Sequence, residues 1–165
     1  GNTRTTGARL RPAKFEEIPQ DNQVLHTLVG DSQLSTSPCY LASGEVLFYE
    51  DDAAADCFVL LSGKVEILRA GRVIGAVSEP GSFIGEMGPL RGKPRSATVV
   101  AREECVLLVI APADFNGFFL RHPEMAMTLA RTLAERLDTQ NQKLQEAEER
   151  LAGVGVHVRE MSSLL

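Results

Sequence analysis

The chain has 165 residues, of which 44% are hydrophobic, so it is long enough for one domain with a packed core. Its net charge of -5 argues against a nucleic-acid duplex as a partner of this chain alone, because phosphates favour basic surfaces. The longest apolar run, "CVLLVIA", is far shorter than the roughly 20 residues of a membrane span, and the polar first twenty residues do not resemble a signal peptide.

Cysteines and histidines are few and scattered. Cys39, Cys57 and Cys105 form no close pair, which argues against a disulfide framework or a zinc site. This pattern favours buried thiols in a reducing, cytoplasmic compartment. The three histidines are equally dispersed and supply no metal triad. We therefore expect neither a metal nor a cofactor.

Residues 1–38 form a polar N-terminal arm. Pro12, Pro19 and Pro38 interrupt it. The run "NQVLHTLVG" is compatible with a short helix or a strand, and we expect the rest of the arm to be loosely structured.

Residues 39–111 alternate short apolar runs with turn signals. The runs are "EVLFYE", "CFVLLSG", "KVEILRAG", "RVIGAVSEPG", "SATVVARE" and "CVLLVIA". Their spacing is typical of a sandwich or barrel. Strict alternation in "KVEIL" points Val65 and Ile67 inward, and "SG" and "AG" suit hairpin turns. The sequence predicts a mainly β fold with α: an antiparallel β-roll (jelly roll) that hides its strand edges, followed by a short helix and a long C-terminal helix.

Residues 112–152 have a helical period. The run "PADFNGFFLRH" predicts a short hinge helix that stops at His122, because a residue before proline is pushed out of helical space. Pro123 suits the first position of a long helix, which we expect to end near Gly153 and to leave 153–165 as a flexible tail. At 1.5 Å per residue this helix is roughly 45 Å long, more than a small roll needs for cover.

One face of the long helix carries residues at alternating spacings of four and three, the pattern of a coiled-coil seam. The positions are Ala126, Ala130, Leu133, Leu137, Gln140, Leu144, Ala147 and Leu151. We expect this seam to join two copies of the chain in a homodimer. The alternative is a helix that packs only on its own domain.

The stretch "FIGEMGPLRGKPRSATVV" combines groups that suit two parts of one ligand. The guanidinium of Arg95 suits a phosphate, Ser96 adds a hydroxyl, and Ala97 leaves room for main-chain N–H groups. The carboxylate of Glu86 suits a sugar hydroxyl, and Gly85 permits close approach of the main chain. "EMGPL" fits a single helical turn whose N–H groups face the phosphate. The stretch therefore predicts a ligand with a hydroxyl and a phosphate close together, such as a ribose cyclic phosphate.

This stretch resembles the phosphate-binding cassette of the cyclic-nucleotide-binding domain family, which includes protein kinase A regulatory subunits, nucleotide-gated channels and the bacterial catabolite activator protein. The cassette has the form F-G-E, a few residues, then R-[STA]-A. Here Glu86 and Arg95 are nine residues apart, and Ile84 is an extra residue after the phenylalanine. The likeness covers roughly residues 41–144, including "SGEVLFYEDD" and "FVLLSGKVEIL". Asp51 stands where the family usually has glycine, which we expect to alter a turn remote from the cassette.

The resemblance implies a role for each matched residue. Glu86 takes the ribose 2'-hydroxyl, Arg95 holds the cyclic phosphate, and Ile67 lines the nucleoside pocket. Residues of the long helix close over the purine. The implied ligand-binding set is Ile67, Phe83, Ile84, Gly85, Glu86, Met87, Arg95, Ser96, Ala97, Arg136, Gln140 and Asn141.

The resemblance implies a regulatory sensor rather than an enzyme. Its ligand would be cAMP, with cGMP left open by Ser96, and ligand would change the arrangement of the helices. Two alternatives are a structural dimerisation module with a degenerate pocket and the sensor fragment of a longer channel, kinase or transcription regulator. A metal-dependent jelly-roll enzyme is disfavoured because 41–110 contain no histidine. The 14 residues after Leu151 are too few for a helix-turn-helix.

Overall fold

The computed structural model of the chain describes residues 10–21, 23–34 and 37–163. The chain divides into two compact units, residues 1–126 and residues 127–165. The first unit contains all the strands, and the second consists of most of a single long helix.

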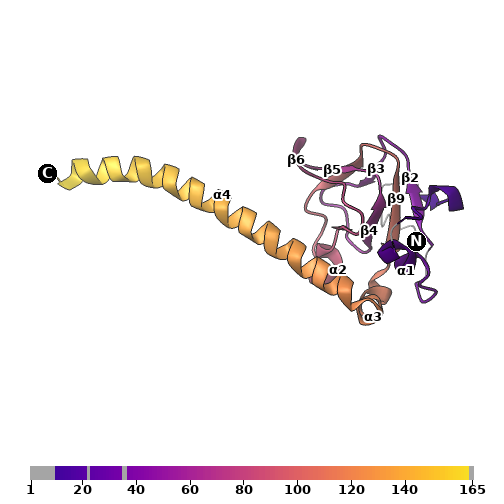
Figure 1. The fold of residues 1–165 in the computed structure, drawn as a ribbon. Coiled ribbons are helices and arrows are strands. Elements are labelled where there is room, and N and C mark those ends of the chain that lie inside the picture. The colour runs from indigo at the N-terminus through magenta and orange to yellow at the C-terminus, as the bar shows by residue number, and fades with distance from the viewer. Residues whose placement is uncertain (1–9, 22, 35–36, 164–165) are drawn as a thin grey trace. The chain divides into compact units, whose positions relative to one another are not determined.

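Two antiparallel sheets form the roll (Figure 1). Their strand orders are β1-β2-β9-β4-β7 and β3-β8-β5-β6. The strands are β1 (Arg11–Pro12), β2 (Cys39–Leu41), β3 (Val46–Phe48), β4 (Cys57–Ser62), β5 (Val65–Arg69), β6 (Arg72–Val77), β7 (Phe83–Ile84), β8 (Thr98–Ala101) and β9 (Cys105–Ile110). Each predicted run contains one of these strands, so the predicted roll is confirmed.

The core of the roll lies between the two sheets. Strands β4 and β9 are the most apolar and pair with each other, Phe58 opposite Val109 and Leu60 opposite Leu107. The buried cluster combines side chains from the first sheet with Leu47 and Val65 of the second. Burial of whole aliphatic side chains, about 1.5–3 kcal/mol each, stabilises this arrangement.

The predicted hairpin turn at Ser62-Gly63 is wrong, because β4 and β5 belong to different sheets and this turn connects the two sheets. The hairpin turn predicted at Ala70-Gly71 is confirmed, because β5 pairs with β6. At the first turn Gly63 has φ +96°, and a Cβ there would lie 2.3 Å from the carbonyl oxygen of Glu104. At the second turn Ala70 and Gly71 both have positive φ, which a tight turn between twisted strands requires. Strand β5 leaves the turn with Val65 fully buried, as its alternation predicts.

The N-terminal arm is more regular than expected. Strand β1 pairs with β2, and the guanidinium of Arg11 lies over the ring of Tyr40. The run "NQVLHTLVG" contains a helix, with Leu25 and Leu28 buried; Asn22 at its start lies outside the described residues. The helical elements of the arm are η1 (Phe15–Glu17) and α1 (Gln23–Val29).

A sharp joint follows the roll. His122 caps a short helix with φ -129° and ψ 67°, outside helical space, and Pro123 begins the next helix. This geometry confirms the predicted effect of proline on the residue before it. The elements are η2 (Pro112–Asp114), α3 (Phe115–Arg121) and α4 (Pro123–Ser163).

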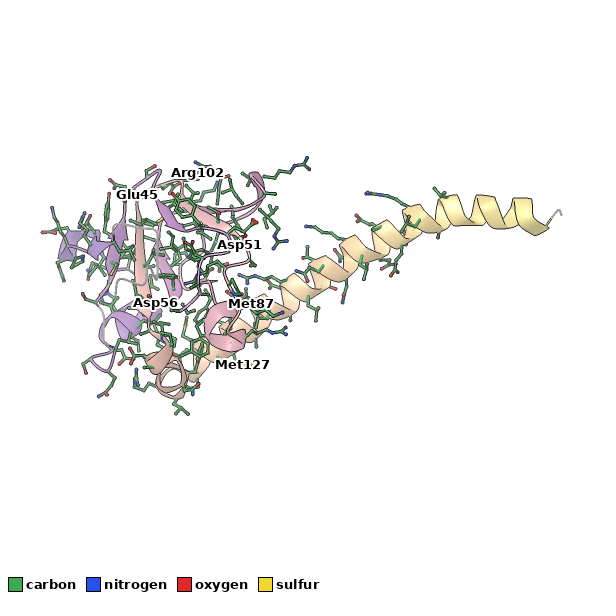
Figure 2. All side chains as sticks on the ribbon, turned by 180° about the vertical axis from the view of Figure 1, so that it is seen from behind. Glu45, Asp51, Asp56, Met87, Arg102 and Met127 are labelled. Carbon is green, nitrogen blue, oxygen red and sulfur yellow. The ribbon has the colours of Figure 1, made fainter. Side chains whose placement is uncertain are left out.

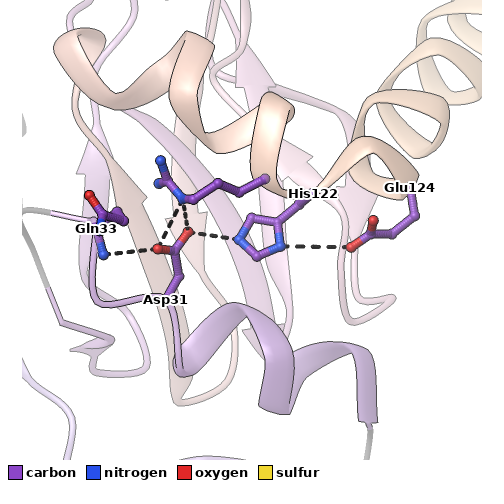
Figure 3. A network of polar contacts seen from close by, with 5 residues as sticks. Asp31, Gln33, His122 and Glu124 are labelled. Carbon is purple, nitrogen blue, oxygen red and sulfur yellow. Dashed lines mark hydrogen bonds and ion pairs between the residues drawn. The ribbon is translucent and has the colours of Figure 1, made fainter.

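A polar network with a buried centre connects this joint to the N-terminal arm (Figure 3). The Nε2 atom of His122 lies 2.7 Å from the carboxylate of Asp31, and Arg121 donates from Nε to the same carboxylate at 2.9 Å. The main-chain N–H of Gln33 supplies a further bond, and Glu124 lies 3.8 Å from the Nδ1 atom of the histidine. The side chains of Asp31 and His122 are only 3% and 7% exposed. The network therefore fixes the segment after α1 to the end of α3.

Helix α4 runs to Ser163, so the expected end near Gly153 is wrong, and the predicted flexible tail is helical up to that residue. A glycine inside a helix costs only about 1 kcal/mol relative to alanine. The apolar spacing also continues beyond Leu151 through Val154 and Val158 in the sequence, which favours continuation of the helix. None of the described helices has the length and apolar content of a membrane span.

Candidate ligand-binding site

The cassette folds as a strand, a helical turn and a returning loop. After β7 the chain enters α2 (Met87–Arg91), which ends where Gly92 adopts φ +62° and donates its N–H to the carbonyl oxygen of Gly88. A Cβ on Gly88 would lie 2.7 Å from the Cβ of Ala54, so α2 packs tightly on the loop between β3 and β4. The predicted helical turn is present, and it brings Arg95 back beside Gly85.

Arg95 is the centre of the site. Its Nη1 donates to the carbonyl oxygen of Gly85 at 3.0 Å, and its Nη2 donates to the carbonyl oxygen of Asp56 at 2.7 Å. Its guanidinium carbon lies 4.1 Å from the ring centroid of Phe48 and 5.8 Å from that of Phe58. The guanidinium plane is therefore fixed by two carbonyl groups and by an aromatic face.

Gly85 makes room for this arginine. Its φ of +75° lies in the left-handed region, and an added Cβ would lie 2.5 Å from Nη1 of Arg95 and 3.2 Å from the ring of Phe48. From the sequence we assign Gly85 the role of letting the main chain approach a ligand, and this role stays a prediction. The structure gives a further reason, because only glycine leaves space for the guanidinium.

The guanidinium of Arg95 is a buried cation with incomplete compensation. The residue is 4% exposed, and its Nε is buried without a hydrogen-bond partner. Within the described part of the chain, no hydrogen bond joins the guanidinium to a carboxylate. Burial lowers the pKa of Arg95, while the neighbouring Cys57, Asp56 and Asp52 oppose this shift. Because burying a charge is costly unless it is paired, this position favours an anionic ligand.

Asp51 holds the main chain of Arg95, which corrects an expectation. The turn at this residue was expected to be remote from the cassette, yet its N–H donates to the carbonyl oxygen of Arg95 at 2.8 Å, and Arg95 donates back to Asp52 at 2.9 Å. Asp51 adopts φ +70°, which explains why glycine suits the position; aspartate tolerates this conformation better than most residues. Asp51 and Asp56 belong to the same loop between β3 and β4, and both are labelled in Figure 2.

Glu86 follows Gly85 directly and lies at the start of α2. It is 1% exposed, and its carbonyl oxygen accepts the N–H of Leu90 at 3.1 Å. Met87, the next residue, is half-buried as the first residue of the helix. The predicted acid and the predicted main-chain contacts thus lie in one short turn beside the arginine, and their contacts with a ligand stay a prediction.

The other predicted residues of the roll divide into two groups. Phe83 and Ile84 are buried in the core, where Phe83 contacts the rings of α3 and Ile84 joins the central cluster. Ile67 on β5 is partly buried beside this cluster and lies opposite Val99 of β8. Ser96 is exposed and Ala97 is buried, both directly after Arg95. A ligand contact by these residues also stays a prediction.

Arg136, Gln140 and Asn141 lie on α4, in the second unit. Gln140 and Asn141 are exposed, and Arg136 is half-buried. Their proposed contact with a purine stays a prediction.

Sequence reasoning missed the residues that hold Arg95 in place. Phe48 is distant in the sequence, and the hydrogen bond from Arg95 to Asp56 goes to a carbonyl oxygen, which any residue carries. The main-chain N–H of Glu50 donates to the hydroxyl of Thr98 in β8. The Nε atom of Arg69 donates to the carbonyl oxygen of Ser96, just before this strand. The one available signal was Phe48 within "SGEVLFYEDD", the second segment that resembles the family.

Comparison with known proteins identifies a domain family that includes the residues of this site. The sequence model of the cyclic nucleotide-binding domain matches residues 38–122, more than half of the chain. The chain belongs to the cyclic nucleotide-binding domain family. The matched residues include the whole roll from β2 onward, the cassette and the joint at His122.

Several known proteins contain a similar domain. The Pycsar effector protein XpPycTIR of Xanthomonas perforans is 29% identical over 81% of this chain and 43% of its own length. The cyclic AMP receptor protein of Thermus thermophilus is 35% identical over 57% of this chain and 45% of its own. The crystal structure of the Thermus thermophilus catabolite activator protein superimposes with a TM-score of 0.58 at 31% identity, over 66% of this chain and 53% of that one.

These relatives are longer proteins. The chain spans less than half the length of the two curated relatives named above, so the similarity is that of one domain. This cyclic nucleotide-binding domain is homologous to cAMP sensors and belongs to a ligand-binding, regulatory family rather than to a catalytic one.

Proposed function

We propose that this cyclic nucleotide-binding domain senses a 3',5'-cyclic mononucleotide, with cAMP as the preferred ligand. The observation that carries the proposal is the buried guanidinium of Arg95, whose hydrogen bonds to the described residues all go to carbonyl oxygens. The likeness to a cyclic AMP receptor protein supports cAMP as the ligand. The cyclic phosphate would supply the negative charge that this position favours.

The site is arranged to bind with little reorganisation. The carbonyl oxygens of Gly85 and Asp56 fix the guanidinium, and the aromatic face of Phe48 supports it. Fewer rotamers are therefore frozen on binding, which favours affinity. Glu86 at the start of α2 would accept the 2'-hydroxyl of the ribose.

The Glu86 contact is tested by changing the protein and the ligand together. We expect Glu86→Ala to weaken cAMP binding by about tenfold, because a hydrogen bond to a charged group contributes about 1.5–3 kcal/mol. The same substitution should hardly change the affinity for 2'-deoxy-cAMP. Calorimetric titration of all four combinations gives the coupling energy. Glu79→Ala, which removes an exposed acid before β7, is the control. Equal losses for both ligands would show that Glu86 acts on the fold alone.

The response to ligand would pass from the cassette to the joint. Phe83, at the start of the cassette, contacts Phe118 and Phe119 of α3, with ring centroids 6.4 Å and 5.6 Å away. Phe118 in turn lies 4.9 Å from the ring of His122. A ligand that binds one arrangement of these rings more tightly would shift the joint between α3 and α4.

Helix α4 would join two copies of the chain in parallel. Its seam residues Leu137, Leu144 and Leu151 are 59%, 58% and 72% exposed. Basic residues flank one side of the seam at seven-residue intervals: Arg136, Lys143 and Arg150. In an antiparallel pair these rows would face each other and repel, whereas a parallel pair places Lys143 opposite Glu148 of the second copy.

The double variant Leu137→Glu and Leu144→Glu should be monomeric. Each substitution would place like charges opposite each other across the seam, at positions where a dimer buries leucine. Light scattering of the variant and of the unchanged chain measures the mass. The control, Thr139→Glu with Gln142→Glu, adds the same charge off the seam and should stay dimeric. A monomeric unchanged chain, with and without cAMP, would contradict the dimer.

A further inference from the structure

A second arginine contacts the main chain next to the site. Arg69, the last residue of β5, donates from Nε to the carbonyl oxygen of Ser96 at 3.2 Å. Ser96 directly follows Arg95, and Arg69 is 27 residues away in the sequence. The arginine is exposed, so this bond does not serve the core of the roll.

Because the peptide bond is planar, the contact with the carbonyl oxygen of Ser96 also sets the direction of the next N–H group. The carbonyl group of Ser96 and the N–H of Ala97 belong to one trans peptide unit, so they point in opposite directions. Arg69 holds the carbonyl oxygen on the side of β5. The N–H of Ala97 is therefore held pointing away from β5, on a buried residue beside Arg95.

The turn that carries Arg69 is itself anchored. The N–H of Ala70 donates to Oε1 of Glu50 at 3.1 Å, and the N–H of Glu50 donates to the hydroxyl of Thr98 at 2.9 Å. The β5–β6 turn, the β3–β4 loop and the strand after Arg95 thus form a closed set of contacts. Arg69 is consequently held near Ser96 by its neighbours rather than by its own side chain alone.

We propose that Arg69 is a positioning residue for the anion site: it orients the Ser96–Ala97 peptide so that the N–H of Ala97 faces the same phosphate as Arg95. The proposal rests on the proposed function, since it assigns a donor to the cyclic phosphate. Arg69 itself does not touch the ligand in this arrangement. It acts through the main-chain N–H of Ala97.

The first test compares two arginines of the same turn. Arg69→Met removes the donor and the charge but keeps an aliphatic stem, and Arg72→Met removes the same charge from the residue paired with Arg69 across the turn. We expect cAMP affinity to fall about three- to tenfold in the Arg69 variant, the effect of one lost hydrogen bond. The Arg72 variant should stay within about twofold, with equal melting temperatures for both variants. Equal affinities in the two variants would overturn the proposal.

The second test uses the two phosphorothioate diastereomers of cAMP, in which sulfur replaces one phosphate oxygen or the other. In the unchanged chain their affinities should differ, because sulfur accepts a hydrogen bond from Ala97 more weakly than oxygen does. The ratio of the two affinities should move toward one in Arg69→Met and should stay unchanged in Arg72→Met. A ratio that is unaltered in both variants would mean that Arg69 acts by charge alone and would overturn the proposal. If the unchanged chain binds none of these ligands, the proposed function fails, and this assignment fails with it.

Discussion

Replacing Arg95 by alanine should weaken cAMP binding about tenfold or more, because the phosphate would lose charge-assisted hydrogen bonds that contribute about 1.5–3 kcal/mol. Arg95→Lys should restore binding only in part. An ammonium group cannot bond to the carbonyl oxygens of Gly85 and Asp56 and also present a planar fork to an anion. Calorimetric titration of both variants measures the two losses.

The control for Arg95 lies in the same cassette. Arg91 is exposed at the end of α2, and Arg91→Ala removes an equal charge without touching the buried site. Its affinity for cAMP should stay within about twofold of the unchanged chain. Unchanged affinity in Arg95→Ala would show that the phosphate binds elsewhere.

Replacing Asp31 by asparagine should lower the free energy of unfolding by about 3 kcal/mol at neutral pH, the usual cost of breaking a buried ion pair. Burial acts to raise the pKa of Asp31, but hydrogen bonds from His122, Gln33 and Arg121 outweigh it and hold the pKa below the ordinary value of 3.8. Asparagine removes the charge from this network. Urea unfolding at fixed protein concentration measures the loss.

The pH dependence of this loss has a definite sign. A carboxyl group whose pKa is lower in the folded than in the unfolded state stabilises the fold above the unfolded pKa, and this contribution is lost as the pH falls through the folded pKa. The difference between the unchanged chain and Asp31→Asn should therefore shrink below about pH 4. The exposed Asp21→Asn is the matched control and should change stability little. A loss equal to that control, or one that grows in acid, would contradict the network.

The sequence predicted the elements whose signals are local. Ser62-Gly63 and Ala70-Gly71 marked turns, because left-handed backbone favours such residues, but only the second turn belongs to a hairpin and the first connects the two sheets. The proline after His122 marked the joint between the helices for a similar reason. Strands β1, β2 and β7 were not predicted, because two or three residues are too few to show a period. Gly153 predicts an end of α4 that the structure does not have, because the apolar spacing continues past this glycine.

The sequence indicated which residues form the candidate site, but not the groups that hold Arg95 in place. The nine-residue step from Glu86 to Arg95 predicts a phosphate ligand, and this ligand stays a prediction. The groups that hold the guanidinium were hidden, because the carbonyl oxygens of Gly85 and Asp56 carry no side-chain signature and Phe48 lies far away in the sequence. The role of Asp51 was misjudged for the same reason, since its contact with Arg95 is made by the main chain.

The most direct test of the proposed sensor is calorimetric titration of the unchanged chain with cAMP, cGMP and a cyclic dinucleotide, with a thermal shift measured in parallel. A saturable site for cAMP is expected, with a dissociation constant of about 1 μM or lower, equivalent to about -8 kcal/mol. The cyclic dinucleotide should bind more weakly, because the site offers one buried guanidinium for one phosphate. Saturating cAMP and cGMP that produce neither heat nor a change in melting temperature would contradict the account.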